Sequence, residues 1–187
     1  MKNNNKLNNN KSFNTKDTAM KKLTILIALL LVVLSTNAFA QVNATATATV
    51  TIVTPIGITK SVDMSFGNVA TNGTAVGTVV LTPAGTRTAT GVATLPATTG
   101  TVTAASFAVT GSGTYTYAIT LPAAAITLVG TTAGVTASTF TSTPSVAGAL
   151  TAGAQTLLVG ATLNLPATAV TAGVYTSAAF TVTVNYN

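Results

Sequence analysis

The chain has 187 residues, of which 48% are hydrophobic and only 5% are charged, and its formal net charge is +6. It contains no His, Cys or Trp, and its two acidic residues are Asp17 and Asp63. The length predicts one domain. The lack of Cys excludes disulfides. Without imidazoles and with only two carboxylates, the chain has few of the side chains that catalysis or metal binding uses.

The positive charge lies almost entirely at the N-terminus, where all the Lys residues except Lys60 precede residue 23. Beyond that point the charged residues are Lys60, Asp63 and Arg87, two cations and one anion, which leave a net charge of +1. A segment this neutral lacks the basic surface that binds a phosphate backbone, so we expect no nucleic-acid partner.

Residues 20–40 have the pattern of a secretory signal peptide. Lys21 and Lys22 precede an apolar run over Leu23–Leu34, and Ala38-Phe39-Ala40 is a small-x-small cleavage site. The run is shorter than the roughly 20 residues of a transmembrane helix. We therefore expect cleavage after Ala40, a secreted protein and no transmembrane segment afterwards. Residues 1–19 are expected to be a polar leader extension, with the true start at Met20.

Residues 41–187 are expected to form a single all-β domain, because Thr and Val favour strands and the apolar residues recur with a period of two. Many short strands with frequent turns predict an antiparallel sandwich or barrel of about eight to ten strands. The small-residue segment Ala123–Gly153 carries no clear pattern. The candidate strands are Ala44–Val53, Ile56–Lys60, Val62–Phe66, Val76–Thr82, Arg87–Leu95, Val102–Thr110, Thr114–Leu121, Gly134–Thr141, Thr156–Leu165 and Tyr175–Tyr186.

The strip Gln41–Thr54 has two interpretations. It is either the first strand of the domain or an N-terminal arm that adds to the sheet of a neighbouring subunit. It is regular and uncharged, with no Lys or Pro to discourage edge pairing before Pro55. The face expected to be buried by a partner consists of Ala44, Ala46, Ala48, Val50 and Ile52.

The final strand has the clearest alternation. Its expected core face consists of Phe180, Val182, Val184 and Tyr186, with Ala178 before them and Thr181, Thr183 and Asn185 opposite. A second short alternating pair, Phe107 and Val109, is also expected to face the core.

No catalytic, metal or cofactor site is expected, because the chain has no Glu, His or Cys and residues 41–187 hold a single carboxylate. Lys60 beside Ser61 is formally a Ser–Lys pair, but a solvated charge at a strand end is the favoured interpretation. Lys60, Asp63 and Arg87 are expected to form a surface pair or to cap sheet edges. Tyr115 and Tyr117 share a strand face, which suggests either core packing or an aromatic platform for a sugar.

Four segments resemble a family of small secreted bacterial β-sandwich proteins that is itself similar to spore-coat-protein-U-like pilins of the archaic chaperone–usher class. The matching motif residues are Met64, Phe66 and Gly67 in one segment, and Gly173 and Tyr175 before the alternating final strand. Pilins of this class usually carry a disulfide, which this chain lacks. The segments are VTPIGITKSVDMSFGNV (53–69), GTVVLTPAGTRTATG (77–91), ASFAVTGSGTYTYAITLP (105–122) and GVYTSAAFTVTVNYN (173–187).

The resemblance implies an immunoglobulin-like sandwich and a structural role in a surface fibre, in which the N-terminal strand of one subunit adds to the next. It implies other copies or other pilin-like subunits as partners, with a periplasmic chaperone and an usher, and transit through the periplasm to the outer surface of a Gram-negative bacterium. The main alternative is a monomeric secreted binding domain, for example for glycans. An ice-binding Thr array and an amyloid-forming matrix protein are further alternatives.

Overall fold

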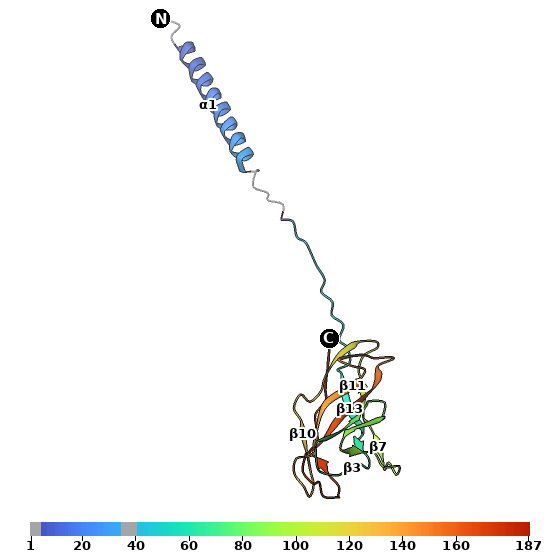
Figure 1. Cartoon of the computed structure of the whole chain (residues 1–187). Coiled ribbons are helices and arrows are strands. Elements are labelled where there is room, and N and C mark those ends of the chain that lie inside the picture. Colours follow the sequence, from blue (N-terminus) through green and yellow to red (C-terminus); the bar gives the residue numbers. More distant parts are fainter. Residues whose placement is uncertain (1–4, 35–40) are drawn as a thin grey trace. The chain divides into compact units, whose positions relative to one another are not determined.

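The computed structural model describes residues 5–34 and 41–187 (Figure 1). The chain divides into two units, residues 1–50 and 51–187, which are described separately. In the first unit, the helix α1 spans Asn5–Leu34 and contains the predicted apolar run. Among the described residues, no helix is long and apolar enough to cross a membrane. The predicted cleavage site at residues 38–40 lies outside the described residues.

The second unit is built of short strands, and every strand pair in its described residues is antiparallel. The strands are β1 Gly57–Val62, β2 Ser65–Phe66, β3 Ala70–Thr71, β4 Gly77–Leu81, β5 Arg87–Gly91, β6 Ala93–Thr94, β7 Val102–Thr103, β8 Ala105–Thr110, β9 Thr116–Thr120, β10 Ile126–Val129, β11 Thr136–Thr143, β12 Ala147–Ala149, β13 Ala154–Leu165, β14 Thr176–Ser177 and β15 Thr183–Tyr186.

These strands form one large and one smaller sheet, with two further short pairs. The large sheet has eight strands in the order β1-β8-β13-β11-β10-β14, and β4 and β5 continue from β13. The smaller sheet has the order β12-β9-β15. Side chains from both sheets share a common core, so the fold is an all-β, antiparallel, sandwich-like arrangement, as the sequence predicted.

The longest strand, β13, is central to the large sheet, where it pairs with β8, β11 and β4 (Figure 1). Its inward residues Leu157 and Val159 are fully buried, whereas Thr156 on the opposite face is exposed. Gly160 is required where β4 crosses closely, because a Cβ there would lie 2.1 Å from the carbonyl oxygen of Leu81. The strand therefore links the two ends of the sheet.

Buried apolar residues form two clusters that share β13. The first cluster lies between the sheets and joins β8, β13, β9 and β15, with Phe107, Leu157, Tyr117 and Val184 among its members. The second contains residues of β4, β6 and the end of β13, and the chain around Phe66 and Tyr175 packs against it. Ile56 and Ile58 pack against the first cluster.

The predicted strands correspond to the observed ones with several corrections. Arg87–Leu95 and Val102–Thr110 are each interrupted, and Tyr175–Tyr186 is strand only at β14 and β15. In the patternless segment Ala123–Gly153, β10 and β12 were not predicted. β10 has the sequence Ile-Thr-Leu-Val and is only four residues long, and β12 consists of the small residues Ala-Gly-Ala, which show no alternation. The expected alternation of the final strand is present, since Val182 and Val184 are buried and Thr181, Thr183 and Asn185 are exposed.

The strip Gln41–Thr54 is the largest correction. No strand is assigned anywhere in it, so the prediction of a first strand over Ala44–Val53 is wrong for the sheets of this chain. Three of its four largest apolar side chains are exposed, Val42 at 90%, Val50 at 84% and Ile52 at 90%, whereas Val53 is half-buried. The alternating residues therefore lack the sheet partner that would turn their pattern into a strand.

Candidate functional site

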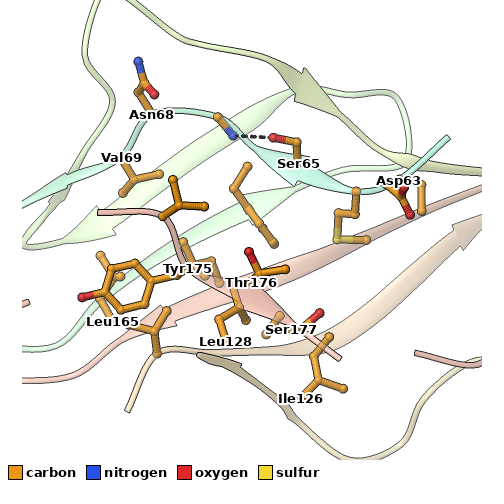
Figure 2. A pocket seen from close by; sticks show the side chains of 18 of the residues that line it. Asp63, Ser65, Asn68, Val69, Ile126, Leu128, Leu165, Tyr175, Thr176 and Ser177 are labelled. Atoms are coloured by element: carbon orange, nitrogen blue, oxygen red, sulfur yellow. Dashed lines mark hydrogen bonds between the residues drawn. The ribbon is translucent and has the colours of Figure 1, made fainter. Parts of the chain in front are cut away.

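The candidate site is a cleft of about 950 Å³ over the large sheet (Figure 2). One wall is the chain from Val62 to Thr71, and the other is the chain from Val170 to Phe180. The floor consists of apolar side chains of the sheet, among them Phe107, Ala137 and Leu163. In Figure 2, Ser65, Asn68 and Val69 lie across from Tyr175 and Thr176, with Leu128 and Leu165 below.

The cleft is almost free of net charge. Lys60 and Asp63 are the charged residues among those lining it, and their side chains pair at 2.7 Å. Both remain exposed, at 56% and 80%, so the pair contributes little to stability. This ion pair is the surface pair that the sequence suggested, and Arg87 is not part of it. A cleft with an apolar floor and neutralised charge suits an uncharged, largely apolar occupant.

Hydrogen bonds fix the first wall to neighbouring loops. The Ser65 hydroxyl donates to the Thr101 carbonyl at 2.7 Å, and the Asn68 side chain donates to the Thr98 carbonyl at 3.0 Å. Arg87 on β5 donates from Nη1 to the carbonyls of Phe66 and Asn68. The sequence did not predict these partners of Arg87, because the acceptors are backbone carbonyls, which every residue carries.

The motif Met64-x-Phe66-Gly67 lies in this wall. Met64 packs against the first cluster and Phe66 against the second, so the wall spans both cores. Gly67 has φ +63°, and a Cβ there would lie 2.3 Å from the Thr99 carbonyl oxygen. Glycine is required at this position for both reasons.

The second wall is held by Tyr175. Its hydroxyl donates to the Thr171 carbonyl at 2.8 Å and accepts from the Thr132 backbone N–H at 3.2 Å. Hydrogen bonding by Thr132 lowers the pKa of the Tyr175 phenol below that of free tyrosine. The ring packs on Gly130, where a Cβ would lie 2.4 Å from it. Gly173, the other predicted motif residue of this wall, is exposed.

The edges of the cleft include unpaired strand positions. β14, whose residues Thr176 and Ser177 line the cleft, is an edge strand of the large sheet because it pairs with β10 alone. β15 is an edge strand of the smaller sheet, and its own residues do not line the cleft. The preceding residues Ala178–Val182 carry no strand assignment, and Ala178, Ala179 and Phe180 line the cleft. An edge strand presents backbone N–H and C=O groups that an added strand can pair with.

The structure does not form the aromatic platform that the sequence allowed. Tyr117 is fully buried and donates to the Gln155 side-chain carbonyl at 2.7 Å, whereas Tyr115 is 49% exposed and precedes β9. Tyr115 instead contacts Tyr186, with ring centroids 5.6 Å apart. Lys60 Nζ donates to both carboxylate oxygens of Asp63 and does not form the Ser–Lys pair with Ser61. The described residues contain no group of three or more His, Cys, Asp or Glu that could hold a metal ion.

Comparison with known proteins gives one match. No curated protein and no solved structure shows significant similarity to the chain. A family described as a domain of unknown function, DUF4402, matches residues 56–186. The match covers both walls and the floor of the cleft, and it begins just after the strip Gln41–Thr54. The chain therefore belongs to the DUF4402 family.

Proposed function

We propose that this chain is a non-catalytic structural subunit of a bacterial surface fibre, of the fimbrial or pilin-like kind. In this proposal the strip Gln41–Thr54 of one subunit adds as a β-strand to the cleft of a neighbour. The observation that carries the proposal is that one chain contains two complementary features. One is an exposed, alternating strip without strand partners, and the other is an open apolar cleft beside an edge strand.

The strip has the chemistry of an added strand. Ala44, Ala46, Ala48, Val50 and Ile52 alternate with Thr, so an extended conformation places the apolar residues on one face. Ten residues in that conformation span about 33 Å. Val50 and Ile52 would supply most of the buried area, because Ile56 and Ile58 already pack in the subunit's own core.

The cleft has matching properties. Its floor is apolar, and its two charges neutralise each other, so an uncharged strand meets no unpaired charge. β14 and the residues that follow it, Ala178–Phe180, offer backbone groups along one side. This mode of binding is β-augmentation, in which backbone hydrogen bonds supply affinity and pockets for alternate side chains supply specificity.

Addition of a strip from one copy to the cleft of the next is a heterologous contact. Such a contact repeats without closing and produces a filament. The resemblance to spore-coat-protein-U-like pilins supports the same role, and it extends the proposal to a secretory signal peptide at residues 20–40, to chaperone and usher partners, and to the outer surface of a Gram-negative cell.

The test compares Gln41–Asn187 with a version that begins at Thr54, by light scattering and negative-stain electron microscopy. The longer chain is expected to form multimers or fibres, and the shorter one to remain a folded monomer, because the strip contributes no strand to the domain. A monomeric longer chain at high concentration would contradict self-assembly. That result would favour the alternative, a monomeric secreted binding domain, and glycan arrays would then be the next measurement.

A further inference from the structure

The turn after β3 contains Asn72-Gly73-Thr74. Asn72-Gly73 is the one Asn-Gly pair in the whole sequence. Asn72 is exposed, and the turn connects β3 to β4. Glycine after asparagine is chemically notable because it has no side chain to shield its backbone nitrogen from the asparagine side chain. The exposed amide carbon of Asn72 is therefore followed in the chain by a backbone nitrogen without a neighbouring side chain, and the N–H of this nitrogen donates to Thr71 Oγ1 at 3.2 Å.

Two hydrogen bonds of the turn are accepted by the side-chain oxygen of Asn72. The Thr74 hydroxyl donates to Asn72 Oδ1 at 2.9 Å, and the Thr74 backbone N–H donates to the same oxygen at 3.3 Å. Two donors on one carbonyl oxygen polarise the carbonyl. They also stabilise the negative charge that the oxygen acquires when a nucleophile adds to the carbon, as donors in an oxyanion hole do.

We propose that Asn72 is a site of spontaneous deamidation in the folded protein. The Gly73 backbone nitrogen loses its proton to solvent and forms a bond with Asn72 Cγ. The Cγ–Nδ2 bond then breaks, ammonia leaves, and a five-membered succinimide remains. Water adds to either carbonyl of this ring and breaks one C–N bond, which yields aspartate or isoaspartate. Water is the only co-reactant, and no atom changes its oxidation state overall.

Three other described asparagines are less suited to this reaction. Asn68 is followed by Val, and its Nδ2 donates to the Thr98 carbonyl at 3.0 Å. Asn164 is followed by Leu, and its Nδ2 donates to the Ser138 hydroxyl at 2.9 Å. Asn43 in the strip is exposed but is followed by Ala. These three residues serve as internal standards in a single sample.

The reaction would change a sensitive place in the domain. A Cβ at Gly73 would lie 2.5 Å from Ala169 Cα, so the turn packs directly on the chain that leads into the second wall of the cleft. Isoaspartate inserts an additional carbon into the backbone at this contact. Either product adds a carboxylate, which takes residues 41–187 from a net charge of +1 to zero. This inference does not depend on fibre assembly.

The test is incubation of the purified full chain at mildly alkaline pH, followed by tryptic peptide mapping with mass spectrometry and isoaspartyl methyltransferase labelling. Lys60 and Arg87 bound one tryptic peptide that contains both Asn68 and Asn72, so fragmentation compares the two residues directly. We expect conversion at Asn72 well before conversion at Asn68, Asn164 or Asn43. Equal rates at Asn72 and Asn43 would overturn the proposal.

Two variants separate the turn's contribution from that of the Asn-Gly pair. Thr74→Val removes the hydroxyl donor, retains the backbone donor and should slow the reaction about fivefold, the effect of one neutral hydrogen bond. Asn72→Gln should abolish the product at this position. In urea the Thr74→Val effect should disappear, because the turn is lost. A Thr74→Val rate equal to wild type in the folded chain would overturn the proposed role of the turn.

Discussion

The hydroxyl of Tyr186 joins the last strand to the base of the N-terminal strip, because it donates a hydrogen bond of 2.8 Å to the carbonyl of Thr54. The same hydroxyl accepts from the Ser112 backbone N–H at 2.7 Å. A Cβ at Gly111 would lie 2.3 Å from this oxygen, so the turn before β9 is shaped around it. Tyr186 thus fixes the point at which the strip leaves the domain.

Substitution Tyr186→Phe should lower the free energy of unfolding by about 1–3 kcal/mol, because it removes two hydrogen bonds and leaves a part-buried Ser112 N–H without its acceptor. Urea denaturation of residues 41–187 measures the change. Tyr115→Phe is the matched control. The Tyr115 ring contacts Tyr186, and we expect a change within about 0.5 kcal/mol because the Tyr115 hydroxyl makes no hydrogen bond with the described residues.

Charge placed on the apolar face of the strip should prevent assembly and leave the domain intact. The double substitution Val50→Asp and Ile52→Asp puts carboxylates where the proposal buries side chains. Both residues are exposed within the subunit, so the monomer should unfold at the same urea concentration as wild type. Light scattering of the assembled sample measures the loss of multimers.

The control for that experiment is Thr49→Asp with Thr51→Asp, which adds the same charge on the opposite face of the strip. We expect this variant to retain most of its assembly, with sensitivity to low salt concentration. If both double variants abolish assembly equally, net charge rather than strand addition controls assembly, and the proposed contact is wrong.

Substitution Leu157→Ala should destabilise the domain by about 2–5 kcal/mol, because it creates a cavity between the sheets. Leu157 is completely buried in the first cluster. The neighbouring Leu158 lies on the other face of β13 and is only half-buried, so Leu158→Ala should cost clearly less. Equal losses in urea denaturation would indicate that the register of β13 differs by one residue.

Gly67 and Gly85 both have positive φ, so their alanine variants can be compared to test the close contact of Gly67 in the wall of the cleft. At Gly85, φ is +81° and a Cβ would meet nothing within 4 Å, so Gly85→Ala should cost about 1–2 kcal/mol from backbone strain alone. Gly67→Ala adds the overlap with the Thr99 carbonyl and should cost more. Thermal unfolding of both variants tests this order, and the reverse order would contradict the described wall.

Tyr117 should make stability depend on pH above about 10, the pKa of free tyrosine. Burial raises the pKa of Tyr117, so the folded state holds its proton at pH values where the unfolded state has lost it. The contribution of Tyr117 is therefore complete below pH 10 and is lost as the pH rises through the folded-state pKa. Urea denaturation at increasing pH should show a steeper decline for wild type than for Tyr117→Phe, and parallel declines would argue against burial of the phenol.

The sequence predicted the parts of the fold that local alternation encodes. In the final strand, buried Val182 and Val184 alternate with exposed Thr183, because the period of two is a property of the strand itself. The same pattern in the strip predicted a strand that the domain does not contain. Alternation identifies a face but does not identify its partner, and a strand requires both.

The cleft could not have been predicted from local pattern. Its walls are more than a hundred residues apart in sequence, and its floor comes from several strands of the large sheet. Arg87, which fixes the first wall through backbone carbonyls, looked like a surface charge. The five residues that the resemblance singled out all line the cleft: Met64, Phe66, Gly67, Gly173 and Tyr175. Gly67 also carried a local signal, since an isolated glycine beside a strand suggests a close backbone approach.

The position of β13 also affects the order in which the molecule can fold. β4, β8 and β11 each lack one neighbour until β13 has been synthesised, and the contacts that complete the sheet join residues such as Val79 and Leu163, which are far apart in sequence. Such non-local pairing slows folding, because the loop entropy is lost before the contacts form. The large sheet therefore cannot be completed before residues 154–165 have been synthesised, so most of the chain precedes the strand that joins it together.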